Sequence, residues 1–311
     1  MTDATNMFFM GKGGVGKSTA AALNSLFLAQ KGFQVLIVSL DPAHNLSDIF
    51  EKKLSDKPEK IADNLMGIEI DQDYWIRRYL KDVQNQIKRT YSYLTAFNLE
   101  KYFEVIKYSP GLEEYALILV FKDIRQKFGH LDFLMFDMPP TALGLRFFTL
   151  PTLSLIWIEQ LVALRKEIIK KRDIITKVKL IKKEVETDKI LNKINEMKND
   201  YQNLKDIFED SNQTLINIVL NPDKLSLAES TRIVEALHDI NITCSQIINN
   251  KMQLHSSCDD INATFSAIPI CQCPYSETQL IGLPNLEQFL KANDSVLEEQ
   301  VNHLLPSYEE K

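Results

Sequence analysis

Cysteine, glycine and proline are scarce over most of this 311-residue sequence, and their absence excludes several protein classes. Residues 1–243 contain no cysteine, and the four cysteines that follow are too few for a secreted scaffold built on disulfides. No glycine or proline occurs between Thr152 and Asn221, so nothing in that stretch breaks a helix. Apolar residues make up 45% and charged residues 25%, which are globular values and exclude a disordered or collagen-like chain.

Long apolar runs and targeting signals are missing as well. The longest strongly apolar stretches, Tyr115–Phe121 and Ser154–Leu164, are too short to span a bilayer. Residues 1–10 lack the basic segment and apolar run of a secretory signal. The formal net charge of −6 argues against DNA as a partner. We therefore expect a cytoplasmic protein that is not an integral membrane protein.

Short apolar segments alternate with helical patterns along most of the chain. The expected strands are Met7–Met10, Val35–Ser39, Gly67–Ile70, Phe133–Phe136, Leu215–Leu220 and Thr243–Ile248. Apolar strands that alternate with helices predict an α/β fold with a mostly parallel sheet covered on both faces. We assign residues 1–72, 128–146 and 211–311 to this core.

Two segments that read as helical interrupt the core, residues 73–127 and 147–210, and we expect them to form an inserted α-helical subdomain. In the second segment, apolar residues at helical spacing change phase near Thr187 and Asp188. This pattern predicts either an antiparallel helical hairpin or one long helix with a stutter. Between Arg165 and Lys205, thirteen basic residues outnumber seven acidic ones, which we interpret as a solvated helical face.

The glycines are concentrated in residues 11–18, which read Gly-Lys-Gly-Gly-Val-Gly-Lys-Ser after an apolar strand and before a helix. Glycines let backbone N–H groups turn toward phosphate oxygens, and the following helix directs its positive end to the same place. Lys17 would bind the outer phosphates, and the Ser18 hydroxyl would bind Mg²⁺. The sequence thus predicts a P-loop NTPase whose loop residues are Gly11, Gly13, Gly14, Val15, Gly16, Lys17, Ser18 and Thr19.

Lys12 gives this loop a second lysine, and with it the sequence resembles the P-loop ATPases that have a deviant two-lysine loop. Residues 41–48 (Asp-Pro-Ala-His-Asn-Leu-Ser-Asp) and 137–146 (Asp-Met-Pro-Pro-Thr-Ala-Leu-Gly-Leu-Arg) are similar to switch I and switch II of one family. That family comprises the arsenical-pump and tail-anchored-protein targeting ATPases. The resemblance covers most of the chain except the two helical segments.

The resemblance implies Mg²⁺-dependent ATP hydrolysis by a homodimer in which Lys12 reaches the partner's nucleotide. It implies that Asp41 orients or activates the attacking water and that Asn45 contacts the phosphates or this water. Asp137 would hold Mg²⁺ through water, beside Ser18. The sequence supports these positions independently, because Asp41 and Asp137 each follow an apolar strand, at the sheet edge where ligands bind.

The nucleotide base that the protein prefers is predicted from residues 249–253, which read Asn-Asn-Lys-Met-Gln. A guanine site of the type Asn-Lys-x-Asp needs a carboxylate at the position of Gln253, so the sequence favours ATP over GTP. The resemblance implies that Asn249 or Asn250 contacts adenine and that Pro269 and Ile270 cover its other side.

The cysteines differ from the family's patterns in two ways, which bear on zinc binding and on a metalloid-pump function. Cys271 and Cys273 are separated by one residue, unlike the Cys-x-x-Cys zinc pair of eukaryotic targeting ATPases, and this argues against zinc. The lack of cysteine in residues 1–243 argues against a metalloid-pump subunit. The chain therefore resembles a prokaryotic-type, single-copy member without the zinc motif.

The resemblance also implies a role for the helical segments. Paired across a dimer, they would form a groove for a protein client that contains a hydrophobic helix, with Leu153, Trp157 and Leu161 in its wall. Two alternatives are open: this apolar stripe packs within its own subdomain, or the protein is a nucleotide-gated interaction switch that has no membrane-protein client.

Overall fold

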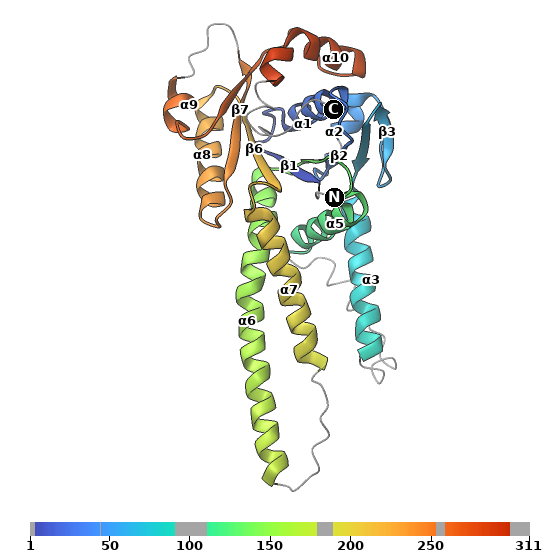
Figure 1. Cartoon of the computed structure of the whole chain (residues 1–311), viewed down its shortest axis with the longest axis vertical. Coiled ribbons are helices and arrows are strands. Elements are labelled where there is room, and N and C mark those ends of the chain that lie inside the picture. Colours follow the sequence, from blue (N-terminus) through green and yellow to red (C-terminus); the bar gives the residue numbers. More distant parts are fainter. Residues whose placement is uncertain (1–3, 44, 91–110, 179–188, 253–258, 299–311) are drawn as a thin grey trace.

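The structure is a computed structural model that describes residues 4–43, 45–90, 111–178, 189–252 and 259–298. Its centre is an eight-stranded sheet in the order β3-β4-β2-β5-β1-β6-β7-β8 (Figure 1). The strands are β1 (Thr5–Met10), β2 (Val35–Ser39), β3 (Glu59–Ala62), β4 (Leu65–Glu69), β5 (Phe133–Asp137), β6 (Thr214–Leu220), β7 (Cys244–Met252) and β8 (Ile270–Pro274). Among the described pairs only β3–β4 is antiparallel, so this is the mostly parallel α/β fold of P-loop NTPases.

Helices cover both faces of the sheet. They are α1 (Lys17–Gln30), α2 (Asn45–Phe50), α3 (Gln72–Thr90), α5 (Leu112–Phe128), α6 (Thr141–Val178), α7 (Lys189–Glu209), α8 (Lys224–His238), α9 (Asp259–Thr264) and α10 (Leu283–Ala292). Successive side chains of a strand point to opposite faces. In β1, Phe8 packs in the core layer that includes residues of α5, α7 and α8, whereas Met7 and Phe9 pack in the layer of α1 and α10. Every residue of β1 is therefore buried.

A cluster of phenylalanines joins the helical segments to the sheet. It consists of Phe8, Phe121, Phe136, Phe147, Phe148 and Phe208, whose rings contact one another with centroid distances from 4.8 to 6.1 Å between Phe8 and the others. All six are almost completely buried. Aromatic rings in such contacts add stabilisation beyond their buried area. The first turns of α6 and the end of α7 are thereby fixed to the strand that precedes the P-loop.

Helices α6 and α7 form the hairpin that was one of the two predictions for residues 147–210. They lie side by side and project from the sheet together with α3 (Figure 1). The connecting residues 179–188, which include Thr187 and Asp188, lie outside the described part of the chain. Helix α6 begins at Thr141 and continues past Pro151, so the expected subdomain boundary at residue 146 falls inside one continuous helix. The domain boundaries stay a prediction.

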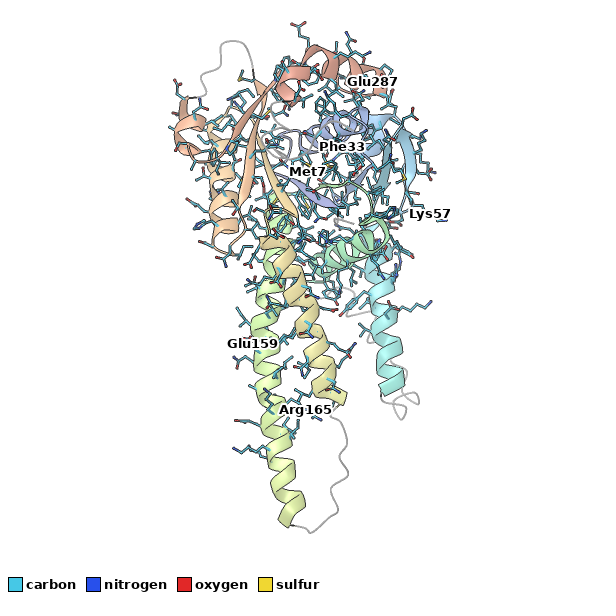
Figure 2. The ribbon with its side chains drawn as sticks, viewed as in Figure 1. Met7, Phe33, Lys57, Glu159, Arg165 and Glu287 are labelled. Carbon is cyan, nitrogen blue, oxygen red and sulfur yellow. The ribbon has the colours of Figure 1, made fainter. Side chains whose placement is uncertain are left out.

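The distal part of α6 extends beyond the body of the protein, as Figure 2 shows for Glu159 and Arg165. By length and composition, Thr141–Lys171 is the one segment of the described residues that could cross a bilayer, and 28% of its apolar window is buried. Its first turns belong to the phenylalanine cluster of the core. Composition alone is therefore weak support for a membrane span.

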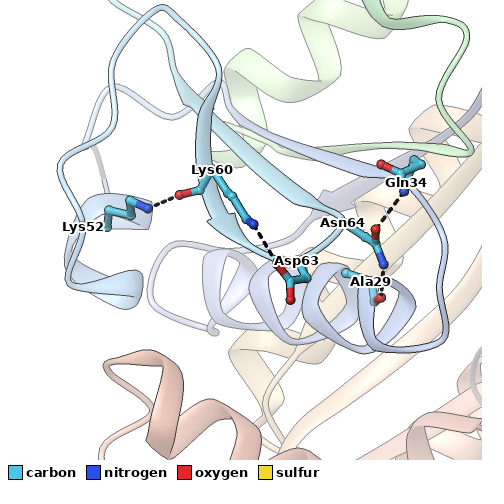
Figure 3. A network of polar contacts seen from close by, with 6 residues as sticks. All are labelled: Ala29, Gln34, Lys52, Lys60, Asp63 and Asn64. Carbon is cyan, nitrogen blue, oxygen red and sulfur yellow. Dashed lines mark hydrogen bonds and ion pairs between the residues drawn. The ribbon is translucent and has the colours of Figure 1, made fainter.

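Strand β3, at the edge of the sheet, was not predicted from the sequence. Its exposed Glu59 and Lys60 give no apolar pattern, although Ile61 is buried in the core and the strand pairs with β4; polar contacts of this region are drawn in Figure 3. Lys60 pairs with Asp63 at 2.7 Å, and the Lys52 ammonium donates to the Lys60 carbonyl. In the turn to β4, Asn64 has the left-handed φ of 60° that asparagine tolerates.

Candidate active site

A cavity of about 710 Å³ opens at the carboxyl edge of the sheet. It is lined by Gly13, Gly14, Gly16, Lys17, Ser18, Thr19, Asp41, Ala43, Asn45, Asp48, Ile49, Pro140, Asn250, Lys251, Pro274, Tyr275, Ser276, Thr278, Gln279, Leu280 and Ile281. The loop after β1, the segment after β2 and the start of α6 thus meet the ends of β7 and β8 there. Ligands of open parallel sheets bind at this edge.

The P-loop adopts a conformation that depends on its glycines. Gly11, Gly14 and Gly16 have backbone φ angles of 144°, 82° and 95°, which residues with a Cβ rarely adopt. At Gly11 a Cβ would also collide with the Val219 carbonyl oxygen of β6. Helix α1 begins directly after Gly16 with the buried Lys17, and no side chain of the described residues caps it. Its first N–H groups and positive end are therefore directed at the cavity as an anion site.

Other predicted loop residues have different surroundings. Gly11 and Val15 are buried residues of the loop and do not line the cavity. Lys12 is half-buried and lies outside the cavity wall. Its expected contact would be with the nucleotide of a second protomer, so this role stays a prediction.

Asp137 ends β5 next to the P-loop and is completely buried. Neither carboxylate oxygen meets hydrogen-bond geometry with any described residue. Burial raises its pKa to about 7; the nearby Ser18 hydroxyl and Lys17 ammonium offset part of this rise, and the charges of Asp41 and Glu69 add to it. A carboxylate that is completely buried is costly, and a divalent cation between it and the serine hydroxyl would reduce that cost. The residues present therefore fit Mg²⁺, which Ser18 and Asp137 would hold.

Switch I follows β2 along one wall of the cavity. Asp41 is buried, and its Oδ1 accepts a hydrogen bond from the Ala43 N–H at 3.0 Å. Asn45 begins α2 and lines the cavity, whereas residue 44 lies outside the described residues. The Glu69 carboxylate accepts hydrogen bonds from the Ser47 N–H, at 2.8 Å, and from its hydroxyl. This pairing attaches α2 to β4, and it was not predicted, because Glu69 lies within the expected strand Gly67–Ile70.

Switch II continues from β5 into α6. Pro140 lines the cavity, and Thr141 is the first residue of the helix. The Thr141 hydroxyl lies 2.5 Å from Glu229 Oε1 on α8 and 3.4 Å from the Gly11 carbonyl oxygen. The P-loop, the longest helix and α8 thus meet at one side chain. Ser226 and Glu229 have the spacing of a helix-capping pair in the sequence. In the structure, however, Asp223 caps α8, and its side chain accepts from the Ser226 N–H.

The two asparagine candidates for the base differ in position. Asn250 lines the cavity and donates from Nδ2 to the Val15 carbonyl at 2.7 Å. The Asn249 side chain is buried and donates from Nδ2 to Gln272 Oε1 on β8 at 2.7 Å. Lys251 also lines the cavity and was not predicted.

The register of β8 places Pro269 and Ile270 away from the cavity, so their expected contact with adenine stays a prediction. Ile270 pairs with Ile247, and the Pro269 carbonyl accepts from the Ile247 N–H, so both residues lie at the start of the strand. The cavity is at the other end of β8, where Pro274 and the following residues form its wall. A parallel strand presents its carboxyl end to the ligand, and that end is five residues further along the chain.

The cysteines are not assembled with other ligands in the part of the chain that the structure describes. Cys271 and Cys273 are half-buried on β8, and Cys244 is buried. Burial raises the pKa of Cys273 to about 11 and that of Cys244 to about 12. No group of three or more potential metal-ligating side chains occurs among the described residues, and Cys258 lies outside them.

The predicted client residues lie on the projecting part of α6. Leu153, Trp157 and Leu161 have exposed fractions of 55%, 72% and 42%. The exposed apolar stripe, as we call it, consists of Leu153, Ile156, Trp157, Leu161, Leu164 and Ile168. Leu155 and Ile158, on another face of the same helix, are buried.

Comparisons with known proteins agree with this geometry. The profile of the family described as anion-transporting ATPase matches residues 4–293. The putative arsenical pump-driving ATPase 2 of Aquifex aeolicus is 27% identical over 301 residues, which cover 91% of this chain and 97% of the relative. The putative arsenical pump-driving ATPase 1 of that organism is 31% identical, with 91% and 76% covered. An ATPase ASNA1 homolog of Plasmodium berghei is 30% identical, with 82% and 65% covered.

Proposed function

This chain belongs to the anion-transporting ATPase family and is an ATPase, and from that premise we propose that it is a Mg²⁺-dependent homodimer which binds or targets a protein client containing a hydrophobic helix. The nucleotide cycle would change the arrangement of α3, α6 and α7 around the client. The setting we propose is the cytoplasm.

The exposed apolar stripe is the observation that carries this proposal. Trp157 and Leu153 expose more than half of their surface, although exposed apolar surface of this extent is unfavourable unless it serves a contact. The stripe continues along α6, whose first residue, Thr141, follows Pro140 of the cavity wall. Because α6 is one continuous helix that includes Pro151, a displacement of Thr141 would be transmitted along it toward Trp157.

In the proposed chemistry, the N–H groups of the P-loop and Lys17 bind the phosphates. Asp41 orients the water that attacks the terminal phosphate, and Asn45 contacts the phosphates from switch I. Mg²⁺, when bound at Ser18 and Asp137, would neutralise charge on the phosphate oxygens. Lys12 would stabilise the nucleotide of the partner protomer.

A peptide-binding experiment tests the client. We expect a fluorescently labelled apolar helix of about 20 residues to bind the purified protein with an affinity that depends on the nucleotide present. Trp157→Glu and Leu161→Glu should each weaken binding at least tenfold, because a carboxylate would be desolvated against the apolar helix. Lys166→Glu is the matched control, since Lys166 is exposed on the same helix outside the stripe.

The outcome separates client binding from ATP hydrolysis. Loss of peptide binding with unchanged ATP turnover supports the proposal. If the wild-type protein binds no apolar helix in any nucleotide state, the client proposal is wrong and the ATPase assignment is unaffected.

Two alternatives receive less support. A switch without a membrane-protein client would be favoured by a buried stripe, but the stripe is exposed. The relatives named arsenical pump-driving ATPases suggest a metalloid-pump subunit. Soft metalloids bind thiolates, and residues 1–243 provide none.

A further inference from the structure

Two carbonyl groups of the P-loop, those of Gly14 and Val15, accept hydrogen bonds from side chains on β7. Asn250 Nδ2 donates to the Val15 carbonyl at 2.7 Å, and the Lys251 ammonium donates to the Gly14 carbonyl at 3.4 Å. In the sheet β7 is separated by β6 from β1, the strand that leads into the loop. Residues about 235 positions apart in the chain therefore meet beneath the phosphate site.

The orientation of the Asn250 amide is determined by its own backbone. Its Oδ1 accepts a hydrogen bond from the Lys251 N–H at 2.9 Å, which leaves Nδ2 facing Val15. The reverse orientation would place two acceptors, Oδ1 and the Val15 carbonyl, against each other. Nδ2 also occupies the space in which a Cβ of Gly16 would lie, so this amide packs directly against the end of the loop.

The backbone of the loop explains why such donors matter. Gly14 and Gly16 have left-handed φ, and residues of this conformation in a short loop bring successive N–H groups to one side. The carbonyl groups are then turned to the other side. A donor on each carbonyl holds the peptide planes, and hence the N–H groups, in the direction that binds phosphate.

Lys251 has an unusual backbone conformation at this point. Its φ is 56°, which is unfavourable for a residue with a long side chain. Lys251 lines the cavity, and its ammonium donates to the Gly14 carbonyl of the loop. Non-glycine residues with a strained backbone occur preferentially at active sites and ligand-binding sites.

We propose that Asn250 and Lys251 are positioning residues for nucleotide binding, which hold the P-loop from behind through the carbonyls of Gly14 and Val15. The proposal rests on the assignment of the cavity to ATP. It gives Asn250 a function directed at the phosphates, whereas the base contact expected from the sequence is directed at adenine. A contact that positions the loop should affect the affinity for every phosphate ligand, whereas a base contact should affect only the affinity for ATP.

The experiment measures binding of three Mg²⁺-loaded probes, ATP, GTP and inorganic tripolyphosphate, by calorimetry. We expect Asn250→Ala and Lys251→Met each to weaken all three by about the same factor, roughly 5- to 10-fold, because each removes one hydrogen bond to the loop. Lys251→Arg keeps a cationic donor and should retain the wild-type affinities. Lys57→Met, on an exposed lysine far along the chain (Figure 2), is the control for loss of a positive charge.

Ligand-free melting temperatures distinguish positioning from stability. Lys251 is exposed, so its variants should melt within about 2 °C of the wild type while tripolyphosphate affinity falls. Loss of ATP affinity alone would overturn the proposal in favour of a base contact, and unchanged affinity for all three probes would overturn it outright. If the wild-type protein binds neither ATP nor tripolyphosphate, the nucleotide assignment itself is wrong.

Discussion

At the scale of single residues, the environment of Asp137 indicates a cation site. Burial raises its pKa to about 7, close to physiological pH, although the nearby Ser18 hydroxyl and Lys17 ammonium act in the opposite direction. The protein retains this costly carboxylate at the end of β5, beside Ser18. A site prepared for a divalent cation accounts for the cost.

The raised pKa predicts how stability depends on pH. The protonated form of Asp137 is favoured in the folded protein, so its contribution to the free energy of unfolding is full below pH about 4. The contribution is lost as pH rises through about 7. In Mg²⁺-free, nucleotide-free solution, Asp137→Asn should therefore lose less thermal stability than the wild type between pH 4 and 8. Calorimetric melting curves measure the difference, and parallel curves for the two proteins would contradict it.

At the scale of elements, the first turns of α6 have polar contacts to two other helices. Thr141 contacts Glu229 of α8, and the Arg146 guanidinium donates to the buried Glu114 carboxylate of α5 at 3.0 Å. With the phenylalanine cluster, these contacts determine where α6 leaves the core. They lie within one and a half turns of the cavity.

We predict that Thr141 and Glu229 are energetically coupled. Thr141→Val and Glu229→Ala remove the two partners of one hydrogen bond, so the double variant should be about 1 kcal/mol more stable than the sum of the single losses predicts. Denaturant unfolding of the four proteins measures this coupling. Thr152→Val, three turns along α6, serves as the control and should be additive with Glu229→Ala. Additivity of Thr141→Val with Glu229→Ala would mean that the contact contributes nothing.

At the scale of the whole molecule, the far ends of α3, α6 and α7 project away from the sheet (Figure 1). Lys12 does not line the cavity of its own chain, in contrast to Lys17. In the proposed homodimer, the two lysines of one loop therefore serve different nucleotides.

This division predicts complementation between two inactive variants. Lys12→Ala and Lys17→Ala should each abolish most ATP turnover as homodimers. Mixed in equal amounts and allowed to exchange, they form heterodimers in which one site has Lys17 from one chain and Lys12 from the other. About a quarter of wild-type turnover should return, since half of the dimers would contain one active site of two.

The controls for complementation are the unmixed variants and a mixture of Lys17→Ala with wild type. No recovery after proven subunit exchange would contradict the action of Lys12 across the dimer. It would leave the roles of Lys17 and Asp41 in the same chain untouched.

The sequence by itself determined those features that depend on local chemistry. Gly14 and Gly16 predicted the P-loop because few residues other than glycine adopt its left-handed φ. The apolar run before Asp137 predicted a buried strand with a carboxylate at its end, and the breaker-free stretch after Thr152 predicted long helices. Polar β3 has no such signal, and it was missed.

Only the tertiary structure decided how distant segments meet. The register of β7 and β8 placed Asn250 and Pro274 at the cavity and removed Pro269 and Ile270 from it. The pairings of Thr141 with Glu229 and of Lys251 with Gly14 join residues 88 and 237 positions apart. Such contacts leave no periodic pattern in the sequence, because they depend on which strand ends share an edge of the sheet and not on neighbouring residues.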